Sequence, residues 1–106
     1  MPHLAALLAE SLELEELYCA SPVCSPARAS ILTGRMPSAH GIHDWLIGGR
    51  HPQAYPDRYL DGQPTTPEVL SRAGYQCFLS GKWHVGDSRT PAPGFYGWYA
   101  HRYGGG

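Results

Sequence analysis

The sequence contains few charged residues, and it lacks any long apolar run. Charged residues make up 16% of the 106 positions and the formal net charge is −1, so no basic surface of the kind that binds nucleic acid is indicated. No run of about 18 apolar residues is present to form a transmembrane helix. Near the N-terminus, Glu10 and Glu13 stand where a signal peptide needs basic and apolar residues. We therefore expect a soluble chain without a signal peptide and without a membrane or nucleic-acid partner, and its localisation stays unknown.

Cysteine and lysine are also scarce. The three cysteines, Cys19, Cys24 and Cys77, are an odd number, so they cannot all pair within one chain and are interpreted first as thiols. Lys82 is the single lysine beside seven arginines, and it is therefore the one candidate for a role that needs an ammonium group.

The apolar content of 42% is enough for one small globular segment, residues 1–106, while 13 Gly and 10 Pro predict many turns. Leucines at helical spacing predict a helix at the N-terminus, and Ser or Thr followed by Pro marks the start of two further helices. We predict an α/β fold with short helices, few strands and long loops. Its expected parts are a helix over 3–13, a strand near 14–19, a helix over 26–33, a loop over 35–64, a helix over 67–73, a strand over 75–80 and a tail rich in Pro, Gly and aromatics over 87–106.

The segment Cys24-Ser25-Pro26-Ala27-Arg28 places a cysteine at the start of the predicted helix 26–33. Unpaired backbone N–H groups and the positive end of the helix dipole favour an anion there. Arg28 lies in the first turn, where its guanidinium can reach the same anion. A well-capped helix beside an ordinary loop cysteine is the alternative interpretation of these five residues.

Two longer blocks resemble the sulfatase family. The first is ASPVCSPARASILTGR over residues 20–35, which contains the Cys-x-Pro-x-Arg core of that family, and the second is GKWHVG over residues 81–86. The resemblance implies that Cys24 is oxidised to formylglycine, whose hydrate attacks sulfur and later expels sulfate as the aldehyde re-forms. It implies that Arg28 holds the hydrate, that Lys82 binds the sulfate with Ser25 and Arg28, and that His84 contacts the formylglycine hydroxyl.

The sequence departs from the family pattern at the metal site. The resemblance implies a divalent cation, usually calcium, but the aspartates with which sulfatases bind it have no counterpart here. The resemblance is to an N-terminal segment of the family's fold that lacks the first central strand. Strand edges and helix faces left bare in this way are normally covered by another chain, so we expect a homo-oligomer.

Histidines provide a second candidate site. His40 and His43 are three residues apart and Asp44 follows, so these three side chains are candidate ligands for zinc, particularly across an oligomer interface. This spacing is not a zinc signature, and unrelated loop residues are the alternative. A further cluster of aromatic side chains is interpreted as a small core under loops rather than as a binding platform: Tyr55, Tyr59, Phe95, Tyr96, Trp98, Tyr99 and Tyr103.

Three functions follow from these observations. The first is a hydrolase of small-molecule sulfate or phosphate esters that uses formylglycine at Cys24. The alternatives are a small zinc-type hydrolase that acts as an oligomer, and a non-catalytic, self-associating fragment.

Overall fold

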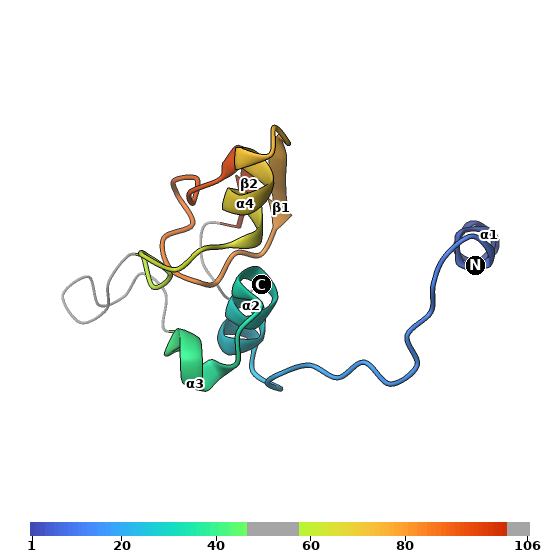
Figure 1. The fold of residues 1–106 in the computed structure, drawn as a ribbon, viewed down its shortest axis with the longest axis horizontal. Coiled ribbons are helices and arrows are strands. Elements are labelled where there is room, and N and C mark those ends of the chain that lie inside the picture. The colour runs from blue at the N-terminus through green and yellow to red at the C-terminus, as the bar shows by residue number, and fades with distance from the viewer. Residues whose placement is uncertain (47–57, 102–106) are drawn as a thin grey trace.

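The computed structural model describes residues 1–46 and 58–101. Four short helices precede two strands, and Figure 1 shows their arrangement. The helices are α1 (Pro2–Ala9), α2 (Cys24–Thr33), α3 (Pro37–His40) and α4 (Thr66–Arg72), and the strands are β1 (Cys77–Gly81) and β2 (Phe95–Ala100). The chain is thus a small α/β structure, as the sequence predicts.

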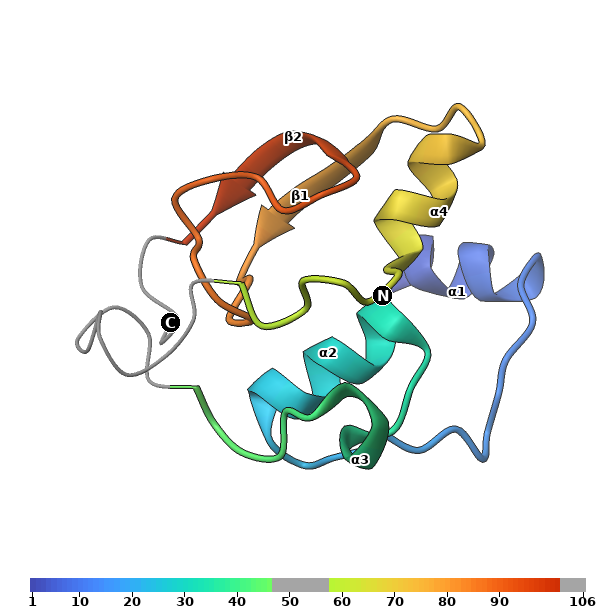
Figure 2. The same cartoon turned by 60° about the vertical axis from the view of Figure 1, so that its left-hand side comes forward.

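The two strands form a parallel sheet and lie side by side (Figure 2). β2 falls within 87–106, where the sequence analysis predicts only a tail. Phe95, Trp98 and Tyr99 are residue types that favour strands, but the surrounding Pro and Gly obscured that signal. The crossover between the strands, residues 82–94, contains no helix, although parallel strands are usually joined by one.

A small apolar core is formed by α2, the segments that follow α3 and precede α4, and the crossover, with β1 and β2 packed against it. Its aromatic part is a set of edge-on contacts, with ring centroids 5.0 Å apart for Trp83 and Trp98 and 5.9 Å apart for Trp83 and Phe95. Tyr96 and Tyr99 point outward and are exposed. The described aromatics of the C-terminal part therefore divide between core and surface, while Tyr55 and Tyr103 lie outside the described residues. The buried apolar residues are Ala29, Ile42, Leu60, Trp83 and Val85.

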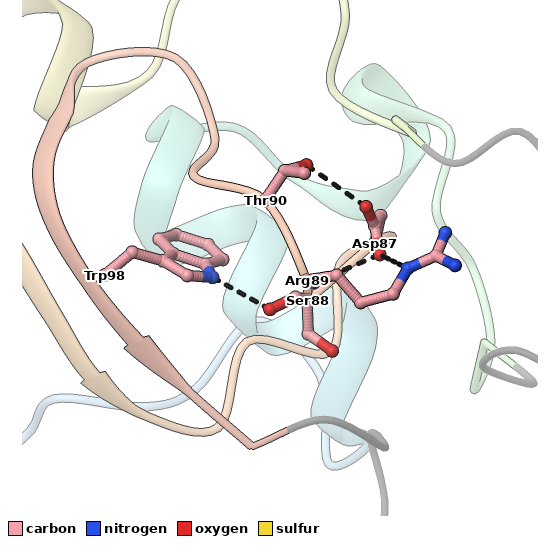
Figure 3. A network of polar contacts seen from close by, with 5 residues as sticks. All are labelled: Asp87, Ser88, Arg89, Thr90 and Trp98. Carbon is pink, nitrogen blue, oxygen red and sulfur yellow. Dashed lines mark hydrogen bonds and ion pairs between the residues drawn. The ribbon is translucent and has the colours of Figure 1, made fainter.

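The crossover is held by polar contacts to its own backbone and to β2 (Figure 3). The indole Nε1 of Trp98 donates to the Ser88 carbonyl oxygen at 2.8 Å. Asp87 accepts hydrogen bonds from the Arg89 backbone N–H and side-chain Nε and from the Thr90 hydroxyl. Burial raises the pKa of Asp87, but these hydrogen bonds outweigh it and hold the pKa below its ordinary value.

Helix α4 begins one residue before the predicted 67–73 and packs closely on the crossover. Glu68 accepts hydrogen bonds from the backbone N–H and the hydroxyl of Thr65, which satisfies groups at the helix start. Gly94 has a φ of +86°, and a Cβ at this position would collide with backbone atoms of Pro67 and Glu68. Strand β1 begins at Cys77, two residues later than the predicted 75–80.

The predictions for residues 3–19 are wrong in two respects. Helix α1 ends at Ala9 rather than at residue 13, and no strand forms within the described residues 14–19. A short helix is marginal when no partner covers its apolar face, and a strand needs a neighbour to receive its hydrogen bonds. Residues of α1 are all exposed, and α1 contacts no other described helix or strand.

Residues 1–20 form an exposed N-terminal arm, and its helix α1 stands away from the rest of the chain (Figure 1). The Cα radius of gyration is 15.3 Å, against about 13 Å for a compact domain of this length. No helix in the described part of the chain is long and apolar enough to cross a membrane.

The predicted loop 35–64 contains a helix. Its one described helix is α3 (Pro37–His40), a single turn that is followed by the C-cap residue Gly41, whose φ is +79°. Pro at a helix start and Gly at its end are the usual signals, but a helix of four residues has too little periodicity to detect. Residues 47–57 of this predicted loop lie outside the described residues.

Exposed leucines on α1 predict self-association. Leu4, Leu7 and Leu8 are spaced to share one face of the helix, and each is about half exposed or more. The arm also carries four Glu and no basic residue, whereas the rest of the chain has eight basic and five acidic residues, so a second copy offers both apolar surface and complementary charge. We expect light scattering at micromolar concentration to show a dimer or larger assembly.

The substitution of Leu4 and Leu8 by Glu should shift this assembly toward the monomer. Ile31→Glu, which changes an even more exposed apolar side chain on α2, is the control and should leave the assembly intact. A monodisperse parent monomer would contradict the prediction.

Candidate functional site

Helix α2 begins at Cys24, two residues before the predicted start of the helix 26–33. Val23, with extended φ and ψ of −101° and 140°, is the N-cap, and Ser25 and Pro26 lie buried inside the first turn. The prediction that Ser25 caps the helix is therefore wrong. Its hydroxyl instead accepts a hydrogen bond from the Leu46 backbone N–H at 3.2 Å. Cys24 thus occupies the first helical position, in a turn where the N–H groups of Cys24 and Ser25 have no partner within the helix and Pro26 has no N–H.

Arg28 joins the two sequence blocks. It lies four residues after Cys24, so both side chains project from the same face of α2. Its Nη1 donates to the Lys82 carbonyl oxygen at 2.6 Å, across 54 positions of sequence. The block 20–35 and the block 81–86 are therefore in direct contact.

His84 lies in the turn that follows β1 and is 3% exposed. Its φ is +56°, a left-handed conformation that residues other than Gly rarely adopt. The ring Nε2 lies 2.8 Å from the Leu46 carbonyl oxygen, and since a carbonyl only accepts, Nε2 carries the proton. The ring also contacts Trp45 edge-on, with centroids 5.7 Å apart.

Burial is the main reason that the pKa of His84 lies below its ordinary value. The hydrogen bond to Leu46 opposes this shift, while the positive charges of Lys82 and Arg28 add to it. His84 is therefore neutral near pH 7, with a lone pair on Nδ1.

The four predicted catalytic residues thus come from two places. Cys24 and Arg28 lie at the N-terminal end of α2, and Lys82 and His84 follow the carboxyl end of β1. The structure brings Arg28, Lys82 and His84 together, with Cys24 one helical turn before Arg28. A helix N-terminus beside the carboxyl end of a parallel strand is where α/β proteins commonly bind anionic ligands.

Two buried polar atoms at this place have no hydrogen-bond partner among the described residues. They are Nε of Arg28, which is a donor, and Nδ1 of His84, which is an acceptor in the neutral ring. A hydroxyl-bearing group can accept from the first and donate to the second, whereas a thiol does both only weakly. The hydrated aldehyde of a formylglycine therefore suits these residues.

His40 is used within the fold. It is 4% exposed, its Nδ1 accepts from the Ile42 backbone N–H at 3.2 Å, and its Nε2 lies 3.0 Å from the Ser30 hydroxyl. Both ring nitrogens are therefore engaged, which ties α3 to α2. Burial and the nearby His43 hold the pKa of His40 below its ordinary value, against a backbone hydrogen bond with Pro26 that raises it.

The other predicted metal ligands do not form a site with His40. His43 and Asp44 are exposed, and Asp44 accepts a hydrogen bond from the Trp45 backbone N–H at 2.6 Å. Within residues 1–46 and 58–101, no group of three or more His, Cys, Asp or Glu side chains could hold a metal ion. The described residues thus fit neither a zinc site nor the calcium site that the sulfatase resemblance implies.

Sequence reasoning missed Leu46. Its backbone contacts both Ser25 and His84, so it links the two halves of the site. No sequence signal could have identified it, because it acts through its N–H and C=O groups, which every residue except proline has.

The buried histidines predict a pH dependence of stability. Because the pKa of His40 and of His84 is lower in the folded chain than in the unfolded one, the unfolded state binds more protons as pH falls below about 6.5. The free energy of unfolding should therefore decrease from about pH 7.5 to about pH 5.5 and level off below the folded pKa values. Urea unfolding at a series of pH values measures this.

His40→Asn should reduce that pH dependence. The matched control is His3→Asn, which changes an exposed histidine on α1 and should leave the pH dependence as in the parent. Equal pH dependence in the parent and in His40→Asn would show that His40 is not buried as the structure has it.

Comparisons with known proteins agree with the two sequence blocks. The sulfatase family model matches residues 1–104. The chain is 36% identical over 104 residues to human N-acetylgalactosamine-6-sulfatase, covering 92% of this chain and 20% of that protein. It is 35% identical over 85 residues to bovine arylsulfatase A, covering 80% of this chain and 16% of that protein. It is 32% identical over 100 residues to rat arylsulfatase G, covering 90% of this chain and 17% of that protein.

The chain thus spans about a fifth of the length of these relatives. Sulfatases generally use formylglycine and a divalent metal ion, and they act on sulfate esters. The resemblance found in residues 20–35 and 81–86 is confirmed: the chain belongs to the sulfatase family.

Proposed function

We propose that this chain carries the part of a sulfatase site that holds the ester's anionic group and the nucleophile, and that its reaction is hydrolysis of sulfate or phosphate esters. The observation that carries the proposal is the hydrogen bond from Arg28 to the Lys82 carbonyl oxygen. It brings the end of the Cys-x-Pro-x-Arg core to the Gly-Lys-Trp-His turn. Family membership supports the same reaction class.

Cys24 is the proposed nucleophile position. Once converted to formylglycine, this residue supplies a hydrate oxygen that attacks sulfur and displaces the alcohol of the ester. The remaining hydroxyl of the hydrate then loses its proton, the aldehyde re-forms and sulfate is expelled, and water restores the hydrate. Arg28 stabilises negative charge at position 24, since its side chain lies on the same face of α2. The free N–H groups of the first helical turn add to this stabilisation.

Lys82 and His84 have different tasks in the proposed reaction. Lys82 attracts the anionic oxygens of the ester as a compact positive charge. His84 accepts a proton from a hydroxyl at position 24, because its Nε2 is committed to Leu46 and its lowered pKa leaves Nδ1 unprotonated near pH 7. Ser25 belongs outside this group, since its hydroxyl is buried against Leu46.

The alternative functions have less support in the described residues. A zinc-type hydrolase needs His40 as a ligand, but both of its ring nitrogens are engaged by Ser30 and Ile42. A non-catalytic, self-associating fragment fits the exposed N-terminal arm, but it gives no role to the two unpartnered atoms of Arg28 and His84. The substrate we propose is a small sulfate or phosphate ester.

Substitution of Cys24 tests the nucleophile. We expect the chain produced with its modifying machinery to show the mass change from thiol to aldehyde at Cys24, and to hydrolyse an aryl sulfate or aryl phosphate. Cys24→Ala should abolish turnover, because no other residue supplies the nucleophile. Cys77→Ala, which removes a cysteine of β1, is the matched control for loss of a thiol and should keep turnover.

His40→Ala and His43→Ala separate this reaction from a metal-activated one. Neither histidine has a chemical role in the proposed reaction, so His43→Ala should keep turnover and His40→Ala should lose only what its weaker fold costs. If chelation or His43→Ala abolishes turnover while Cys24→Ala does not, a metal-bound water is the nucleophile and the proposal is wrong. If the parent with formylglycine at position 24 shows no turnover, the proposal is wrong and the non-catalytic fragment is the remaining interpretation.

Anion binding tests the proposed pocket independently of catalysis. Sulfate or phosphate should raise the midpoint of thermal unfolding, by an amount that corresponds to about 1.4 kcal/mol at ten times the dissociation constant. Arg28→Ala should remove this stabilisation. Arg35→Ala, at the other end of α2, is the matched control and should retain it. A rise in the unfolding midpoint that does not saturate with anion concentration, or that persists in Arg28→Ala, would contradict the proposed anion site.

A further inference from the structure

Ser25 is fully buried, although it is next to the proposed nucleophile position. Its exposed fraction is 0%, and its Oγ accepts the Leu46 backbone N–H at 3.2 Å. A hydroxyl in this position is turned into the protein rather than toward a substrate. The hydroxyl must therefore serve the fold or serve the site through another residue.

Leu46 uses both of its backbone groups in this part of the chain. Its N–H donates to Ser25 in the first turn of α2, and its C=O accepts from His84 in the turn after β1. These contacts join residues that are 21 and 38 positions away from Leu46. One residue therefore connects the helix start to the histidine ring.

The orientation of the His84 ring depends on that connection. Nε2 has the Leu46 carbonyl as its partner at 2.8 Å, while Nδ1 has no partner among the described residues. The backbone of His84 is held at a φ of +56°, which a bulky side chain adopts only when its surroundings fix it. If the Leu46 carbonyl moved, nothing else described would determine which ring nitrogen carries the proton.

We propose that Ser25 is a positioning residue, which holds Leu46 in place so that the Leu46 carbonyl fixes the proton on Nε2 of His84 and leaves Nδ1 facing the site as the acceptor. The catalytic part of this inference rests on the proposed function, because Nδ1 receives a proton only in the proposed hydrolysis. The tautomer itself is a property of the folded chain with or without catalysis.

This role differs from substrate binding in what it changes. A substrate-binding hydroxyl contributes to affinity, so its loss raises KM. A residue that sets the tautomer and direction of the proton acceptor changes the proton-transfer step, so its loss lowers kcat and leaves KM nearly unchanged. The two roles of Ser25 are therefore distinguishable by experiment.

The test is NMR of the chain with its histidines labelled with ¹⁵N. In the parent we expect the His84 ring to show the Nε2–H tautomer, with an Nε2–H proton that exchanges slowly with water. Ser25→Ala should give a mixture of tautomers and raise the exchange rate by about fivefold to tenfold, which corresponds to the loss of one neutral hydrogen bond. The indole N–H of Trp98, which is bonded to Ser88 and to none of the three residues Ser25, Leu46 and His84, reports that the chain is folded.

Ser30→Ala is the matched control. It removes a hydroxyl from the same helix that bonds to His40 instead, and it should leave the His84 signals unchanged. Ser25→Cys keeps the size of the side chain and a weak acceptor, so it should lie between the parent and Ser25→Ala. It also provides a folded variant if Ser25→Ala loses the Trp98 signal.

Unchanged His84 signals in a folded Ser25→Ala or Ser25→Cys variant would overturn the proposal. So would a parent His84 with its proton on Nδ1. The NMR result does not depend on turnover. A parent that hydrolyses no ester would therefore refute the proposed function, while the NMR spectra would still decide whether Ser25 positions His84. Where the parent is active, Ser25→Ala should lower kcat by about tenfold with KM unchanged, and a rise in KM alone would assign Ser25 to the substrate.

Discussion

The hydrogen bond between the Arg28 guanidinium and the Lys82 carbonyl oxygen is the contact on which the site depends. The backbone of α2 lies against α3 and α4 but against neither described strand, so the helix reaches the turn after β1 through side chains. A bond from a charged donor at 2.6 Å contributes about 1.5–3 kcal/mol, more than a neutral one. It fixes the helix start and the turn relative to each other, and it leaves Nε of the same guanidinium buried and without a partner among the described residues.

The electrostatics of the site follow from that contact. Burial is the main reason that the pKa of His84 is lowered, and the positive charges of Lys82 and Arg28 add to this shift, so the imidazole is kept neutral. A buried donor and a buried acceptor without partners carry a cost of desolvation, which a ligand or a modified residue that satisfies both would remove. A hydroxyl group satisfies both atoms, because it accepts from Nε of Arg28 and donates to Nδ1 of His84.

The sequence predicted elements with local signals better than elements that depend on distant partners. Helix α4 was predicted because its capping signals are local. The residues at 24, 28, 82 and 84 were proposed from the resemblance to the sulfatase family, and their catalytic roles stay predictions. The strand near 14–19 was wrong, because a strand requires a hydrogen-bonded neighbour that its own residues do not encode. Strand β2 was missed since its pairing with β1 is non-local, and Leu46 was missed because a backbone contact leaves no mark on residue type. His40 was interpreted as a metal ligand because the sequence does not reveal its burial against Ser30, which depends on tertiary packing.

The measurement that tests the account most directly is a backbone NMR titration of the chain with sulfate or vanadate. If the start of α2 and the turn after β1 form one anion site, the amide signals of Cys24, Arg28, Lys82 and His84 should shift together and saturate with a single dissociation constant. Signals of α1, which stands away from the site, should stay unchanged. Shifts confined to one of the two segments, or two different dissociation constants, would show that Arg28 and Lys82 do not join them into one site.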